Sequence, residues 1–391
     1  TGNFTHFIAD SQDPASISDD RVRTIFEDSQ QRLWVGTLGG GLNRLDRSTG
    51  TFEHFTHDEN DPKSLSENRV RTIFEDNEGR LWVGTDHGIN LLQRSESFTR
   101  YQHDATDPSS LSADRVVVMF QDRADMLWVG TQGGGLNRWN PLDWSFGHYK
   151  GGLAGLSNDE VFSFTQSENG LIYVGTLGGG LAIIDREKGQ TRVLRHDPLD
   201  EFSLSDNRVT ALLHDSQQVL WVGTIAGGLN RQIPGTERFE HFRAEENNPE
   251  SLPSNGIMTL FEDRHGVIWA GTFGGGLSRF DRESGTFSNY QHEVGNPFSL
   301  SGNQVSSIVE DPSGGLWIGT LGKGLNFFDR DTGLFRQFHH DPERQSSISS
   351  DEILSLHLDQ SGVLFIGTQG GGLNVLERLG ADSKTTNFKR Y

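Results

Sequence analysis

The chain has 391 residues, a formal net charge of −20 and no cysteine. A field this negative argues against nucleic acid and anionic membrane surfaces as partners, and no run of about 18 apolar residues offers a membrane span. The 48 glycines and the 33% hydrophobic fraction favour many short strands over a helical core, and no charged-then-apolar signal segment opens the chain.

One phrase recurs eight times along the chain: an apolar residue, an aromatic residue, an apolar residue and then Gly-Thr. Its glycines are spaced 45 to 48 residues apart and are Gly36, Gly84, Gly130, Gly175, Gly223, Gly271, Gly319 and Gly367. A period of about 40–50 residues with strand-like content is typical of β-propeller blades. Since no other segment interrupts the repeats, we predict one propeller domain over residues 1–391.

The second copy illustrates the four strands expected in each repeat. Strand A is predicted at residues 69–75, strand B at 81–85, strand C near 89–93 and strand D near 98–101. A tight turn joins strands A and B, whereas a long polar loop joins strand D to the next strand A. Short runs rich in β-branched residues and flanked by glycine favour strands over helices. The predicted fold class is therefore all-β, a single eight-bladed β-propeller with four antiparallel strands per blade.

The two ends of the chain are expected to close the ring together. There are eight A–B–C sets but nine D-like segments, the first at residues 4–7 and the last at residues 388–391. Sharing one blade between the termini removes exposed edge strands. We therefore predict that residues 4–7 complete the blade whose other strands lie between Glu352 and Leu376. Residues 379–391 are then a surplus strand or a tether to a missing downstream domain.

An aromatic residue lies in the middle of every strand B. These residues are Trp34, Trp82, Trp128, Tyr173, Trp221, Trp269, Trp317 and Phe365. Stacking on a sugar is one interpretation, but their regular recurrence favours a core between blades. The glycine that follows is expected to let the neighbouring blade approach closely.

Other motifs also have structural interpretations. The GGG loops lack the Lys-Ser/Thr of a phosphate loop, and the Asp-x-x-Gly turns lack the spaced carboxylates of a calcium loop. The 14 histidines show no two-ligand spacing, so we expect no metal and no cofactor. The acidic pairs Asp159-Glu160 and Asp351-Glu352 have the residue types of acid–base catalysis, but they stand where the repeat requires polar residues. We predict that the chain is not an enzyme.

Candidate binding residues lie where the repeats differ. Strands alternate in direction, so the D–A and B–C loops share one face of the blades, where the first residue of strand A meets the central channel. We place a ligand-binding site at this channel mouth, lined by Arg21, Arg69, Arg115, Arg208, Glu160, Glu352, Asp86, His87, Gln132, Phe273 and Gln369. Neutral drift without a ligand would also explain such differences.

Three of these residues begin consecutive A strands: Arg21, Arg69 and Arg115. They are expected to form one arc of the mouth. They either pair with loop acids such as Asp20 and Glu67, or offer bidentate donors to a carboxylate or sulfate of a short oligosaccharide.

The sequence LWVGT, followed by GGGLNR and preceded by DPxSLSxNRV, resembles the two-component regulator propeller repeat. The clearest copies span residues 33–44, 127–138 and 220–231. The resemblance implies the periplasmic sensor domain of a hybrid histidine kinase or diguanylate cyclase, and many such receptors sense carbohydrate. It implies a small-molecule or oligosaccharide ligand and membrane-bound kinase or cyclase domains beyond this chain.

The chain departs from many members of that family, which resemble paired seven-bladed propellers followed by an immunoglobulin-like domain. Two functions of other classes therefore stay open. One is a platform for protein–protein interaction, and the other is a polysaccharide lyase or hydrolase.

Overall fold

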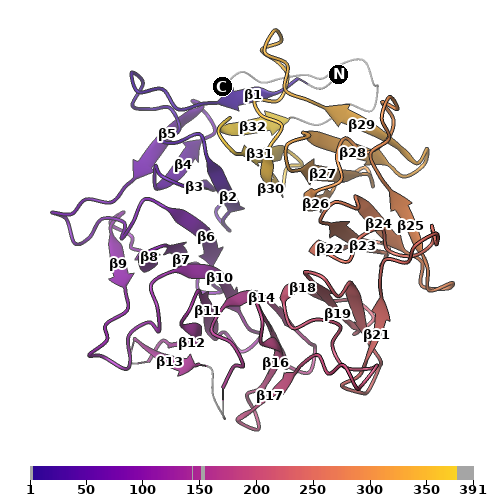
Figure 1. Cartoon of the computed structure of the whole chain (residues 1–391). Helices are drawn as coiled ribbons and strands as arrows, with labels where there is room; N and C mark the ends of the chain where they lie inside the picture. Colours follow the sequence, from indigo (N-terminus) through magenta and orange to yellow (C-terminus); the bar gives the residue numbers. More distant parts are fainter. Residues whose placement is uncertain (1–2, 143, 151–154, 377–391) are drawn as a thin grey trace. The chain divides into compact units, whose positions relative to one another are not determined.

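A computed structural model describes residues 3–142, 144–150 and 155–376. Within these ranges the chain forms 32 β-strands in eight four-stranded antiparallel sheets and no helix. No segment among them is a helix that could cross a membrane. The protein is an eight-bladed β-propeller, which confirms the predicted fold class (Figure 1).

The chain divides into two compact units. The terminal half comprises residues 1–100 and 292–391, and the central half comprises residues 101–291. The prediction that residues 1–391 form one domain stays a prediction, and the segment 379–391 lies outside the described residues.

The terminal half contains blades 1, 2, 7 and 8. Blade 1 contains β2 (Val22–Glu27), β3 (Leu33–Thr37), β4 (Leu42–Asp46) and β5 (Thr51–Phe55). Blade 2 contains β6 (Val70–Glu75), β7 (Leu81–Thr85), β8 (Gly88–Leu92) and β9 (Phe98–Tyr101). Blade 7 contains β26 (Val305–Glu310), β27 (Leu316–Thr320), β28 (Leu325–Asp329) and β29 (Leu334–Phe338). Blade 8 contains β30 (Ile353–Leu358), β31 (Leu364–Thr368), β32 (Leu373–Leu376) and β1 (Thr5–Phe7).

The central half contains blades 3 to 6. Blade 3 contains β10 (Val116–Gln121), β11 (Leu127–Thr131), β12 (Gly135–Asn140) and β13 (Ser145–Tyr149). Blade 4 contains β14 (Val161–Gln166), β15 (Ile172–Thr176), β16 (Gly180–Asp185) and β17 (Gln190–Leu194). Blade 5 contains β18 (Val209–His214), β19 (Leu220–Thr224), β20 (Leu229–Gln232) and β21 (Phe239–Phe242). Blade 6 contains β22 (Ile257–Glu262), β23 (Ile268–Thr272), β24 (Leu277–Phe280) and β25 (Phe287–Tyr290).

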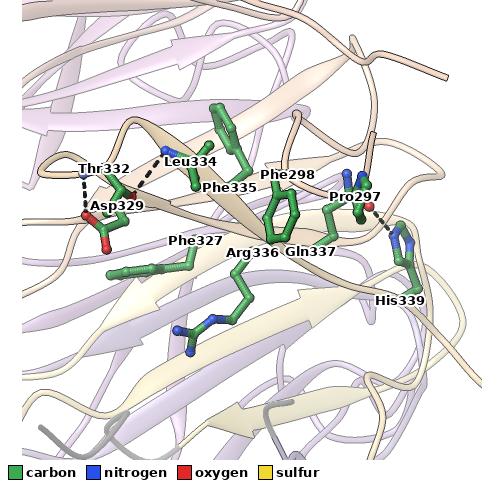
Figure 2. Close-up of a pocket in the computed structure, with 10 residues that line it drawn as sticks. All are labelled: Pro297, Phe298, Phe327, Asp329, Thr332, Leu334, Phe335, Arg336, Gln337 and His339. Atoms are coloured by element: carbon green, nitrogen blue, oxygen red, sulfur yellow. Dashed lines mark hydrogen bonds between the residues drawn. The ribbon is translucent and has the colours of Figure 1, made fainter. Parts of the chain in front are cut away.

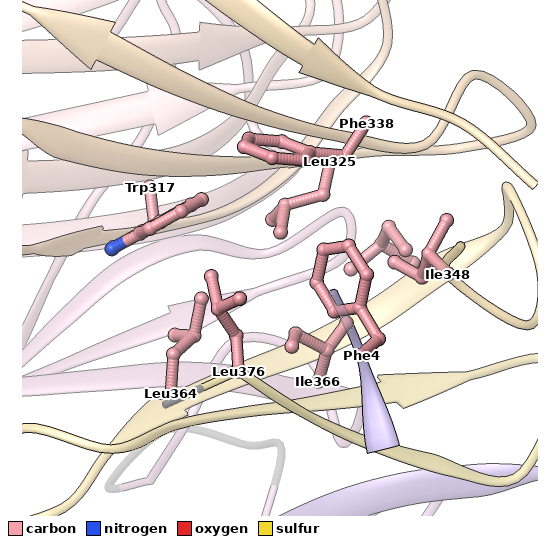
Figure 3. Packing of buried hydrophobic residues seen from close by; sticks show 9 residues of the cluster. Phe4, Trp317, Leu325, Phe338, Ile348, Leu364, Ile366 and Leu376 are labelled. Atoms are coloured by element: carbon pink, nitrogen blue, oxygen red, sulfur yellow. The ribbon is translucent and has the colours of Figure 1, made fainter. Parts of the chain in front are cut away.

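The N-terminal strand completes the last blade, as predicted. In Figure 1, β1 (indigo) runs beside β32 (yellow), and the two strands pair antiparallel with His6 opposite Asn374. The residue before β1 anchors this pairing, because the buried ring of Phe4 packs in a cluster with Phe338 and Leu376 (Figure 3). Strand pairing and apolar burial together hold the two ends of the described chain in one sheet.

The second strand of every blade is fully buried, which confirms the core interpretation of its aromatic residue. The Trp221 indole N–H donates to Asp215, six residues earlier, at 2.8 Å. The glycine that follows leaves room for the next blade. A Cβ atom on Gly223 would lie 2.6 Å from the Ile257 Cγ2 atom of blade 6.

The long D–A loops are held by side chains that recur in the repeat. Before strand A of blade 5, Asn207 Oδ1 accepts the backbone N–H of His196 at 2.7 Å. His196 Nδ1 bonds the carbonyl of Leu204 at 2.7 Å, and Asn230 of strand C accepts the Ser205 N–H at 2.8 Å. The D-strand residue His241 bonds the carbonyl of Ser203. These contacts give His196 and His241 the structural role predicted for them and hold the loop in place.

Candidate ligand-binding face

The face formed by the D–A and B–C loops, here called the loop face, carries the variable positions. The backbone brings these positions together in pairs. In the terminal half, Arg21 of blade 1 forms an isolated β-bridge with Gln369 of blade 8. The N–H of Gln369 also donates to the carbonyl of Glu352 at 3.0 Å. The three predicted residues from these two blades therefore share one stretch of the face.

Arg21 is held by a neighbouring carboxylate. Its Nη2 lies 2.6 Å from Asp19 Oδ2, and its Nε donates to Asp19 Oδ1 at 2.9 Å. Burial alone would raise the pKa of Asp19, but the hydrogen bonds and charge of Arg21 outweigh burial and lower that pKa. Arg21 therefore pairs with a loop acid, but with Asp19 and not with the expected Asp20, whose Oδ1 accepts the Ala9 N–H.

The two residues that replace glycines in blade 2 lie beside charged side chains. Asp86 accepts a hydrogen bond from Arg71 Nε and lies 3.6 Å from Arg69 Nη1. His87 Nδ1 lies 3.6 Å from Glu67 Oε2. Within the described chain, the long ion pair with Asp86 is the one polar contact of the Arg69 guanidinium. Arg69 is therefore less fully neutralised than Arg21.

Sequence reasoning missed Arg23, the second residue of edge strand β2. No acid among the described residues pairs with its guanidinium, although the side chain remains open to water. Although the side chain is exposed, partial desolvation by the surrounding protein lowers the pKa of Arg23, and the nearby positive charge of Arg71 lowers it further. An anionic group of a ligand would offset the repulsion from Arg71, and no acid of the described chain competes for Arg23 as Asp19 does for Arg21, so Arg23 is a stronger candidate for binding an anion than Arg21. Comparing the repeats at one further position of strand A would have revealed it.

The central half presents apolar residues on its loop face. Phe273 is 59% exposed and Ile225 is 43% exposed. Gly256 makes room for both, because a Cβ atom there would lie 2.9 Å from Phe273 Cβ and 3.0 Å from the carbonyl oxygen of Ile225. A flat aromatic ring that faces solvent is a surface on which a sugar ring can stack.

The other predicted residues of the central half are placed as follows. Gln132 forms a β-bridge with Glu160, and its N–H donates to the carbonyl of Arg115 at 2.9 Å. Arg208 pairs with Asp206 at 2.6 Å. Arg115 belongs to the central half, whereas Arg21 and Arg69 belong to the terminal half, so the arc of three arginines stays a prediction.

The acidic pairs at the loop-to-strand junctions serve as anchors. Asp351 Oδ1 accepts the backbone N–H of His340 at 2.7 Å, and the carbonyl of Asp159 accepts the Gly135 N–H at 2.9 Å. No three His, Asp or Glu side chains in the described ranges lie close enough together to hold a metal ion.

A separate pocket of about 490 Å³ lies on blade 7, over strands β28 and β29 and the loop that precedes β26 (Figure 2). Its walls include the rings of Phe298 and Phe327 and the side chain of Leu334. Phe298 is 57% exposed and Leu334 is 47% exposed, so this outer surface is apolar as well as concave.

Five segments of the chain match the family described as two component regulator propeller, namely residues 16–39, 64–87, 203–226, 251–274 and 299–322. The chain carries two component regulator propeller repeats. Each matched segment runs from the D–A loop to just beyond strand B, so it contains both variable positions of the loop face. No curated protein sequence matches the chain.

Solved structures resemble these two component regulator propeller repeats at low sequence identity. The extracellular domain of a putative hybrid two component system from B. thetaiotaomicron is 20% identical, with a TM-score of 0.36, over 93% of this chain and 64% of that one. The chain thus spans less than two thirds of that domain. The Dos1 propeller is 12% identical, with a TM-score of 0.63, over 97% and 95% of the two chains. Virginiamycin B lyase from Staphylococcus aureus is 11% identical, with a TM-score of 0.53, over 96% and 99%. The last two share the propeller fold.

Proposed function

We propose that the chain is a non-catalytic, extracytoplasmic ligand-binding domain of a two-component or cyclic-di-GMP signalling receptor. We further propose that it recognises a carbohydrate or another small extracellular ligand on its loop face. The family match supports this proposal, because the family is described by its place in two-component regulation. Membrane-bound kinase or cyclase domains would then receive the signal.

Arg23 is the observation that carries the binding proposal. Its guanidinium is exposed, lies near the positive charge of Arg71 and has no carboxylate partner within the described chain, so an anion that binds there meets a cation that no acid of the described chain occupies. Arg69 adds a second, partly neutralised guanidinium on the next blade. The fold does not require a positive charge at either position in every blade, since Phe162 stands at the Arg23 position in blade 4 and Gly256 at the Arg69 position in blade 6.

The arrangement favours a short ligand that carries a carboxylate or sulfate, such as an oligosaccharide that contains a uronic acid. Guanidinium groups bind such anions through bidentate hydrogen bonds. The net charge of −20 disfavours long polyanions, but a short ligand can reach a local positive patch. In the central half, Phe273 offers a separate stacking surface for an uncharged sugar ring.

A glycan-binding screen tests this proposal. Neutral, carboxylated and sulfated oligosaccharides are offered to the purified chain, and any that bind are titrated by calorimetry. We expect saturable binding of carboxylated or sulfated members, with weaker binding or none for their neutral counterparts. If no oligosaccharide in the three classes binds saturably, the carbohydrate proposal is wrong.

A second candidate function, a platform for protein–protein interaction, is favoured by the apolar pocket on blade 7 (Figure 2). Exposed phenylalanine and leucine side chains are typical of a surface that another protein covers. A pulldown from the periplasmic fraction of the source organism, with a Phe298→Ser variant as the matched control, tests this function. Loss of a specific partner in that variant would support it, whereas identical captured proteins would count against it.

A further inference from the structure

Neighbouring blades of the central half are tied together at the end of the blades that carries the A–B and C–D turns, here called the turn face. Between blades 5 and 6, Asp215 accepts the Trp221 indole N–H and pairs with Arg282 at 2.7 Å. Glu262 accepts the backbone N–H of Ser216 at 2.8 Å. Between blades 3 and 4, Asp122 accepts the Trp128 indole N–H and pairs with Arg186. Gln166 accepts the backbone N–H of Arg123. We call this set of contacts the blade latch.

The seam between blades 4 and 5 lacks the latch at all four of its side-chain positions. Ser167 replaces the aspartate, Tyr173 the tryptophan, Pro234 the arginine and His214 the glutamate or glutamine. No carboxylate and guanidinium therefore meet across this seam at the latch positions. Instead, the rings of Tyr173 and His214 stack with centroids 6.2 Å apart and an interplanar angle of 21°. Four coordinated changes at one seam, flanked by two intact latches, indicate a specialised site.

A pocket of about 600 Å³ opens at this seam. It is lined by the three replacement side chains Ser167, Tyr173 and His214 and by residues that follow position 234, from Gly235 to Glu237. At the flanking seams, Arg186 and Arg282 fill the corresponding place with a guanidinium. The pocket is therefore the position of a latch arginine that blade 5 does not supply.

The polar groups of this pocket are only partly satisfied. Arg192 and Glu237 form an ion pair with each other. Within the described chain, the Glu168 carboxylate, the Gln218 side-chain amide and the ring nitrogens of His214 have no hydrogen-bond or ion-pair partner. Burial lowers the pKa of His214, against the opposing effect of the carboxylates nearby, so its ring is neutral at pH 7. Glu168 thus gives the pocket an unpaired negative charge.

We propose that this seam pocket binds a small cation of the alkylguanidinium or alkylamine class. The ligand would take the place of the missing latch arginine, with its charged head on Glu168 and its alkyl chain against the stacked Tyr173 and His214 rings. The net charge of −20 raises the local concentration of cations. Because it would bridge two blades on the turn face, this ligand site is separate from the loop face.

Agmatine is a suitable probe, because it joins a guanidinium and an amine through a short alkyl chain. Ligand-detected NMR titration is expected to show saturable binding with a dissociation constant on the order of 1 mM, as befits so small a ligand. N-butylurea has a planar head of the same shape without the charge, and it is not expected to compete. No saturable binding of agmatine, or equal binding of the urea, would overturn the proposal.

Two variants locate the site. Glu168→Gln should weaken agmatine binding about three- to tenfold, as expected for one solvent-exposed ion pair, whereas the control Glu187→Gln, in the C–D turn of blade 4, should leave it unchanged. The double substitution Ser167→Asp with Pro234→Arg rebuilds the latch and should abolish binding while retaining the thermal midpoint of unfolding. If agmatine binds both pocket variants as tightly as the original chain, it binds elsewhere and the assignment is wrong.

Discussion

Trp221 illustrates how single side chains hold the blades together. It is completely buried, its indole N–H bonds Asp215, and its ring lies 4.9 Å from that of Phe280 in the next blade. We expect Trp221→Ala to lower the free energy of unfolding by about 3–5 kcal/mol, because it leaves a cavity between blades. Urea denaturation measures this change. If the Trp221→Ala variant were as stable as the original chain but no longer bound ligand, the tryptophan would belong to a binding site and not to the core.

Substitutions at two glycines in the B–C loop of blade 6 would distinguish the effect of backbone strain from that of a steric clash. Gly274 and Gly276 both have positive φ values, +94° and +84°. A Cβ atom on Gly274 meets nothing within 4 Å, whereas one on Gly276 would clash with the carbonyl oxygen of Tyr290. Gly274→Ala should therefore destabilise the fold by about 1–2 kcal/mol, and Gly276→Ala by clearly more. Equal melting midpoints for the two variants would contradict this assignment.

The Asp19–Arg21 ion pair makes a prediction about pH. In the folded protein, the contact with Arg21 holds the pKa of Asp19 below its ordinary value of about 3.9. The stability that the pair adds is therefore fully present above that ordinary value and is lost as the pH falls through the lower, folded-state pKa. Asp19→Asn should melt at a lower temperature than the original chain at pH 7, and the difference should shrink at pH 3. A difference that does not depend on pH would show that the charge of Asp19 is irrelevant to stability.

At the scale of elements, strand β1 makes the clearest prediction. It pairs with β32, and the Phe4 side chain beside it fills the cluster around Trp317 and Ile366 (Figure 3). Deleting residues 1–8 should lower the melting temperature by several degrees, because it exposes both an apolar surface and a strand edge. Phe4→Ala, which keeps the strand, should have a smaller effect. An unchanged midpoint after the deletion would mean that another segment completes blade 8.

The repeats made the strands predictable, because eight copies impose the same burial on the same positions. Strand A of blade 2 was expected at residues 69–75 and is Val70–Glu75, and strand B was expected where β7 lies. The backbone φ of individual glycines was harder to predict from the sequence. In the B–C loop of blade 6, Gly274 and Gly276 have positive φ values, whereas Gly275 between them does not, and the repeat pattern does not distinguish the three.

The candidate face was predictable in position but not in its charge pairing. Repeat comparison identified the loop ends of the strands, yet Asp19 pairs with Arg21 although Asp20 stands closer in sequence, and Asp86 pairs with Arg69 although Glu67 was expected. Partner choice depends on side-chain directions that a repeat pattern does not encode. Arg23 was missed for a related reason. An arginine within a strand suggests a solvated face, and only the structure shows that no carboxylate among the described residues pairs with it.

For the whole molecule, the central claim is that the loop face binds an anionic group of a ligand at the Arg23 guanidinium. The most direct measurement is calorimetric titration of a carboxylated oligosaccharide from the screen into the original chain, Arg23→Ala and Arg94→Ala. Arg94 lies in the exposed C–D turn at the opposite end of blade 2 and serves as the control. We predict that Arg23→Ala weakens binding about 10- to 150-fold, as expected for a lost charged hydrogen bond of about 1.5–3 kcal/mol, and that Arg94→Ala changes nothing. Equal affinities for all three proteins would contradict the claim and place the ligand elsewhere on the molecule.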